Sequence, residues 1–189
     1  MKKSPSTIGL IVALLIFAFS FGVYFLFLAK KDYYLVDNPT PNTYYFKVNN
    51  GDEKILSGGQ FLKVDLNKGK NSIKVFDKGK KLLYDSVFQV NKNRGLVNIT
   101  NSDYYIHTQY YGYDVNKDSL LMKLDQVSID GKLYYGGAKK MDRLYNEDFY
   151  YNVDEEYDKV IKNIQKLESR TKIFRKEDFL IYYKDYYNL

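Results

Sequence analysis

Few residues of this chain have the types and spacing that catalysis needs. His107 is the single histidine among 189 residues, and cysteine is absent. A general base needs a nucleophile and an orienting group within reach, so a lone imidazole between Ile106 and Thr108 is more typical of a structural strand residue. Ser169–Lys172 matches S-x-x-K without its companion motifs, and no nucleophile elbow, phosphate loop or zinc-protease motif is present. The sequence therefore predicts no catalytic residue and no cofactor, and favours a protein that is not an enzyme.

One acidic segment resembles the start of a calcium loop. Asp114–Asp118 reads D-x-N-x-D, and Asp125 stands at the twelfth position. The sixth position is Ser119, where the turn needs glycine, and the twelfth lacks the bidentate Glu. We interpret the segment as an ordinary loop, because Asp and Asn are common turn residues, and we predict no metal site.

A second acidic group lies further along the chain. Its members are Glu147, Asp148, Asp154, Glu155 and Glu156. Two such carboxylates facing each other across a cleft can hydrolyse a glycosidic bond. Loop solvation and capping of a following helix explain the same residues, so a membrane-tethered hydrolase is the alternative interpretation.

The longest structural signal is an uncharged stretch of 22 residues, 8–29. As a helix it would be about 33 Å long, slightly more than a bilayer core. It exceeds a signal-peptide apolar region, and Phe27–Ala29 places a large residue where cleavage requires a small one. We predict an uncleaved signal-anchor: a cytoplasmic tail over 1–7 and a single transmembrane helix over 8–29.

The orientation of this anchor depends on nearly balanced flanking lysines. Lys2 and Lys3 precede the stretch, and Lys30 and Lys31 follow it. The short basic tail favours the cytoplasm, which places the large domain on the periplasmic or cell-surface side. A cytoplasm-facing, membrane-bound adaptor is the alternative.

Composition excludes some partner classes. The 29 basic and 23 acidic residues are interspersed, which disfavours nucleic acid. Without cysteine, disulfides are excluded. The 21 tyrosines suit half-buried strands, or a Tyr-lined surface for glycan or peptide ligands.

After a linker over 30–42, the pattern becomes that of an antiparallel β-sandwich over 43–150, with an all-β region over 43–113. The expected strands are Tyr44–Val48, Phe61–Leu66, Ser72–Phe76, Leu82–Val90, Tyr104–Tyr111, 120–129 and Lys132–Tyr135. Arg94–Thr100 is expected to be a connection. Asp130-Gly131 suits the two-residue turn of a hairpin.

The last segment, 151–189, has helical periodicity. Tyr157, Val160, Ile161, Ile164 and Leu167 fit one face of a helix. Lys176–Tyr187 fits a second helix, with Thr171–Phe174 extended between them. The aromatic residues of this second helix, Phe179, Tyr182, Tyr183 and Tyr186, form a possible docking face, and packing on the sandwich explains them equally well.

One segment suggests a family. Leu66–Val75 reads L-x-x-G-x-x-x-I-x-V and resembles the hairpin of PEGA-like small β-sandwich modules of bacterial envelope proteins. The similarity covers residues 44–90, and the Pro-Glu-Gly-Ala tetrapeptide is absent. The resemblance implies an Ig/PEGA-like sandwich with a binding or structural role.

These observations predict a membrane-anchored extracytoplasmic binding or scaffold protein of the cell envelope. Its partner would be another envelope protein or a glycan.

Overall fold

The computed structural model describes residues 5–25, 32–111, 125–158 and 168–188. The chain divides into two units, 1–32 and 33–189. Among the described residues the secondary structure is mainly β, in several sheets that are antiparallel except for one strand pair.

The first unit contains the helix α1 (Pro5–Val23). Its large apolar side chains are exposed along its length, including Leu15 (65%) and Phe19 (73%). Within the described part of the chain, however, no helix combines the length and the apolarity that crossing a bilayer requires. The predicted transmembrane helix over 8–29 is therefore not supported, and residues 26–29 of that stretch lie outside the described residues.

The second unit begins with two packed sheets. Sheet 1 has the order β12-β7-β1-β4, and sheet 2 has the order β3-β2-β5-β6. The bounds in sheet 1 are β1 Tyr33–Asp37, β4 Phe61–Val64, β7 Arg94–Asn98 and β12 Tyr145–Asn146. The bounds in sheet 2 are β2 Tyr44–Val48, β3 Lys54–Leu56, β5 Gly69–Phe76 and β6 Leu82–Val90. Phe46, Ile73 and Val75 from sheet 2 pack with Tyr34 and Val36 from sheet 1 in one buried core.

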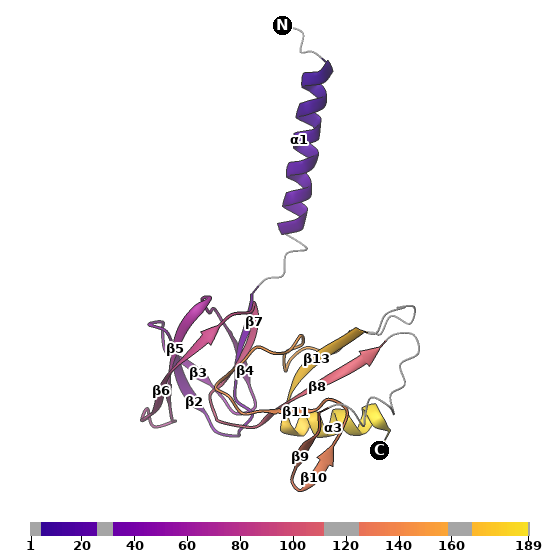
Figure 1. Ribbon diagram of the computed structural model, residues 1–189. Coiled ribbons are helices and arrows are strands. Elements are labelled where there is room, and N and C mark those ends of the chain that lie inside the picture. Colours follow the sequence, from indigo (N-terminus) through magenta and orange to yellow (C-terminus); the bar gives the residue numbers. More distant parts are fainter. Residues whose placement is uncertain (1–4, 26–31, 112–124, 159–167, 189) are drawn as a thin grey trace. The chain divides into compact units, whose positions relative to one another are not determined.

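A third layer lies against sheet 1 (Figure 1). Sheet 3 has the order β11-β8-β13, with β8 Tyr104–Tyr111, β11 Lys139–Met141 and β13 Glu168–Arg175. A hairpin, β9 Val127–Ile129 and β10 Lys132–Tyr134, precedes β11. The helix α3 (Lys176–Tyr187) contacts β8 and β13. Leu35 and Leu96 of sheet 1 are buried with Ile106 and Ile173 of sheet 3, so sheet 1 is covered on both faces.

Several sequence predictions are confirmed. The strands at 44–48, 82–90 and 104–111 have the expected bounds, and the helix over 176–187 is α3. Asp130 and Gly131 join β9 to β10 with φ of 50° and 77°. Positive φ at both central residues is what a type I′ turn requires.

Two predicted connections are wrong, because both are strands of sheet 1. Tyr33–Asp37, assigned to the linker over 30–42, pairs in parallel with Arg94–Asn98, assigned to a connection. Because β1 is buried on both faces, its sequence does not alternate between apolar and polar residues. Its apolar run is also too short to identify a strand by periodicity. The sandwich is therefore not purely antiparallel.

The prediction for the C-terminal segment also needs correction. Glu168–Arg175 forms a strand along the whole of β8, so the segment 151–189 is not wholly helical. The helix expected from Tyr157 to Leu167 falls mostly on residues 159–167, outside the described residues. Residues 69–75 of the segment that resembles a PEGA-like module lie in β5 of sheet 2, and the resemblance stays a prediction.

Candidate functional site

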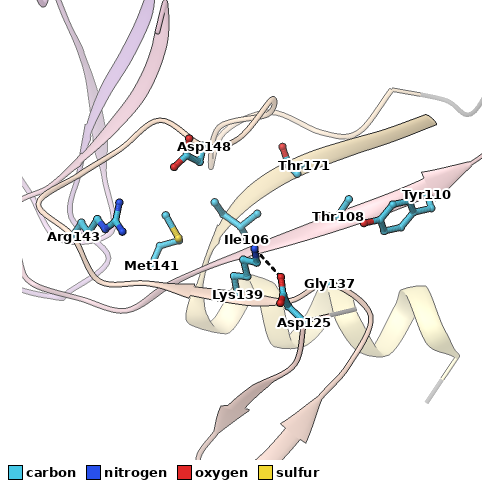
Figure 2. A pocket seen from close by; sticks show the side chains of 10 residues that line it. All are labelled: Ile106, Thr108, Tyr110, Asp125, Gly137, Lys139, Met141, Arg143, Asp148 and Thr171. Carbon is cyan, nitrogen blue, oxygen red and sulfur yellow. Dashed lines mark ion pairs between the residues drawn. The ribbon is translucent and has the colours of Figure 1, made fainter. Parts of the chain in front are cut away.

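The candidate site is an open pocket of about 420 Å³ on sheet 3, on the face opposite α3 (Figure 2). It exists because β8 and β13 are longer than the part of sheet 3 that sheet 1 covers. The burial of β8 shows this: Tyr104 and Ile106 are buried with Leu35 and Leu96 of sheet 1, whereas Thr108 and Tyr110 are half-buried. The uncovered half of the strands, together with the neighbouring side chain of Ile106, forms the floor of the pocket.

The floor is built from alternate residues of adjacent strands. Thr108 of β8 lies directly opposite Thr171 of β13, and Ile106 lies opposite Lys139 of β11. Because side chains alternate between the faces of a strand, Ile106, Thr108 and Tyr110 share the pocket face. The floor thus combines hydroxyl groups with an apolar side chain.

The rim is supplied by segments outside the sheet. Asp125 and Gly137 come from the two ends of the hairpin segment, where the Gly137 amide donates to the Asp125 carbonyl at 2.9 Å. That bond holds the Asp125 carboxylate beside Lys139, 2.7 Å from its Nζ (Figure 2). The hydrogen bond that Lys139 donates to Asp125 raises the pKa of Lys139 and keeps it protonated. Arg143 and Asp148 complete the rim, and Met141 adds an apolar wall.

The acidic group proposed as a hydrolase site is instead bonded to neighbouring segments. Glu147 accepts from the amides of Asn91 and Lys92 at 2.9 and 3.0 Å. Burial raises the pKa of Glu147, but these hydrogen bonds outweigh it and lower the pKa overall. A general acid needs a raised pKa, so Glu147 is unsuited to that role.

The other acids of the group also have local partners. Asp148 pairs with Lys92 at 2.7 Å, and Glu155 accepts from Arg94 and from the Asn152 amide. Asp154 accepts from the Tyr33 hydroxyl, and Glu156 lies 3.4 Å from Lys172. Of these acids, Asp148 alone also lines the pocket.

The predicted docking face lies on the other side of sheet 3. Phe179 and Tyr183 are buried, and Tyr182 and Tyr186 are half-buried. The ring of Phe179 stacks on Tyr105 of β8 at 5.3 Å. The protein's own strands therefore occupy this face, and a docking role for it stays a prediction.

His107 points into the same aromatic layer and not into the pocket. Its side chain is fully buried, its Nδ1 lies 3.0 Å from the Tyr182 hydroxyl, and its ring lies 5.3 Å from that of Tyr186. Burial lowers its pKa to about 4. The imidazole is therefore neutral at pH 7 and fills a structural position.

The loop 114–118 lies outside the described residues, so the structure does not test its similarity to a calcium loop. Its twelfth-position residue, Asp125, is the rim residue paired with Lys139. Among the described residues no group of three His, Asp or Glu side chains is arranged to hold a metal ion.

The pocket residues were not found from the sequence. Thr108, Tyr110, Lys139, Arg143 and Thr171 come from three separate segments, which only the pairing of β11 and β13 with β8 brings together. The one local signal, the alternation of Thr108 and Tyr110 along β8, is shared by any solvent-facing strand.

No family model matches the chain, and neither a curated protein nor a solved structure matches it.

Proposed function

We propose that this chain is a membrane-anchored, non-enzymatic binding protein of the cell envelope that holds a saccharide in the pocket of sheet 3. The pocket carries the proposal. Its volume of about 420 Å³ falls in the range usual for small-ligand sites. Thr108, Thr171 and Tyr110 provide hydroxyls that can exchange hydrogen bonds with a sugar.

Apolar side chains in the same pocket support a saccharide over a purely ionic ligand. Ile106 lies on the floor and Met141 on the wall, beside the charged rim. A sugar ring has an apolar face of C–H groups and an edge of hydroxyls. A site with both chemistries within one small volume fits such a ring.

The anchor is the second part of the proposal. The uncharged stretch 8–29 is flanked by lysines, and the described part of α1 exposes apolar side chains. Such a surface is costly in water and favourable in lipid. We place the sheets on the extracytoplasmic side, where the saccharides of an envelope are found.

Capture of purified envelope polysaccharide by the full-length protein in detergent tests the binding role. We expect Met141→Trp, which fills the pocket from the edge strand β11, to abolish capture. Ile55→Trp is the matched control, because Ile55 is exposed on the edge strand β3 of sheet 2. Capture that survives Met141→Trp, or that fails in both variants, contradicts the proposal.

A second candidate is a protein partner that adds a strand to β6. This nine-residue strand is an edge of sheet 2, and no described strand pairs with its outer side. Val87 is 53% exposed, and the one charged residue of β6, Asp85, is paired with Lys74 at 3.2 Å. Long edges with few charges invite strand addition.

In-cell crosslinking distinguishes this second candidate. A charge at the edge blocks pairing, so Val87→Lys is expected to remove the crosslinked partner while Ile55→Lys retains it. Equal crosslinking in both variants would exclude the β6 edge.

A further inference from the structure

We propose that the pocket of sheet 3 selects saccharides that carry a singly charged acidic group, a carboxylate or a phosphodiester, and that Arg143 binds this group. The inference rests on the proposed function and names the ligand class of the same site.

The charges of the pocket compensate one another except at Arg143. Lys139 is paired with Asp125, and Asp148 is paired with Lys92, each at 2.7 Å. Within the described part of the chain the guanidinium of Arg143 forms no hydrogen bond or ion pair, and only its backbone carbonyl accepts a bond, from Asn146. One positive charge at the rim is thus left for a ligand.

The chemistry of the guanidinium determines which ligand group would use it. Its planar set of N–H donors matches the two oxygens of a carboxylate or phosphate, and such charge-assisted bonds are stronger than those between neutral groups. A single surplus charge matches a single negative charge. A doubly charged phosphate monoester would leave excess negative charge close to the carboxylates of Asp125 and Asp148.

The floor has donors suited to the rest of the ligand. The Thr171 hydroxyl oxygen accepts from the Tyr150 amide at 3.0 Å, which leaves its proton to donate. Thr108 lies opposite on β8. An acidic sugar can therefore place its anionic group at Arg143 and its neutral hydroxyls along the two threonines.

Titration of the full-length protein in detergent with three probes tests the inference. The probes are a galacturonate tetramer, its fully methyl-esterified form, and a glycerol-phosphate oligomer linked by phosphodiesters. We expect at least one acidic probe to bind about tenfold more tightly than the ester. Arg143→Gln should lower the affinity for that acidic probe to the affinity for the ester.

A matched variant controls for the overall positive charge. Lys54 is exposed on β3 of sheet 2, so Lys54→Gln removes one charge far from the pocket lining and should leave the preference unchanged. The relative affinity of the two acidic probes identifies carboxylate or phosphodiester as the preferred group.

Three results would overturn the inference: an ester that binds as tightly as both acids, no binding of either acid, or an equal loss in Lys54→Gln. Each leaves the proposed function intact if envelope polysaccharide is still captured and Met141→Trp still abolishes capture. Loss of the Met141 dependence would instead defeat the proposed function.

Discussion

At the scale of residues, His107 connects burial to a measurable property. Its side chain is 0% exposed, and the rings of Phe179, Tyr182 and Tyr186 surround it. A charged imidazole would lose its hydration without gaining a carboxylate, which is why burial lowers its pKa to about 4.

The pH dependence of stability follows from this shift. The unfolded chain protonates His107 near its ordinary pKa of 6.5, whereas the folded protein does so only near 4. Stability is thus lost as the pH falls through this window, by about 2 kcal/mol between pH 7 and pH 5. Urea unfolding of the wild type and of His107→Gln at both pH values checks this, since the variant should lose less. An equal loss in both proteins would mean that carboxylates, and not His107, cause the effect.

Much of the local structure could be predicted at this scale, and the pocket could not. The turn at Asp130-Gly131 could be predicted because both residues tolerate positive φ. The structural role of His107 could be predicted because the sequence offers no catalytic motif around it. The pairing of Thr108 with Thr171 joins positions 63 apart in sequence, with no local signal to mark it.

At the scale of elements, α3 stabilises sheet 3 through its aromatic face. Phe179 is fully buried against Tyr105, whereas Ile181 on the same helix is 63% exposed. The hydrophobic pattern predicted the helix and its apolar face but not what would cover that face, because a docking surface and a core surface have the same periodicity.

Matched alanine substitutions distinguish the two roles. Phe179→Ala should lower the free energy of unfolding by about 3–5 kcal/mol through lost burial and a cavity. Ile181→Ala should change it little. Chemical denaturation of the two purified variants measures the difference. If Phe179→Ala left the free energy of unfolding nearly unchanged, this face would not be part of the core, which would favour the docking interpretation.

A second contact between elements joins β1 to β13. Arg175 Nε donates to Asp37 at 3.0 Å, Arg175 Nη1 donates to the Gly59 carbonyl, and the Tyr104 hydroxyl donates to Asp37 at 2.7 Å. Asp37 is fully buried, so its carboxylate depends on these donors.

Removal of the arginine should therefore be costly. Arg175→Met leaves a buried carboxylate without its counter-charge, and we expect a loss of about 3–5 kcal/mol. Lys74→Met breaks the exposed pair with Asp85 and should cost less than about 1 kcal/mol. Thermal melting of both variants tests this contrast. Similar melting temperatures for the two would contradict a structural role for the Asp37–Arg175 pair.

At the scale of the whole molecule, the proposed anchor would tether the unit 33–189, which carries the sheets, to a membrane. We expect the full-length protein to stay in the membrane pellet after an alkaline wash. Replacing Leu15 and Phe19 with arginine should move it to the supernatant, because charges are costly in the bilayer core. Wild-type protein in the supernatant would contradict the anchor.

The order of the sheets was beyond sequence reasoning at this scale. Sheet 1 contains β1, β4, β7 and β12, drawn from positions 33 to 146. Its strands Tyr33–Asp37 and Arg94–Asn98 are short and almost wholly buried, and a buried strand lacks the alternation that identifies exposed ones. The sequence did not predict the third layer, because no local pattern indicates that sheet 1 is covered on both faces.

Methyl NMR of the full-length protein in micelles, with and without purified envelope polysaccharide, tests the binding claim most directly. Ile106 and Met141 line the pocket, while Ile55 lies exposed on sheet 2. Binding in the pocket predicts that the methyl signals of Ile106 and Met141 shift with added polysaccharide and that the signal of Ile55 does not. Shifts at Ile55 alone, or no shift at Ile106 and Met141, would contradict it.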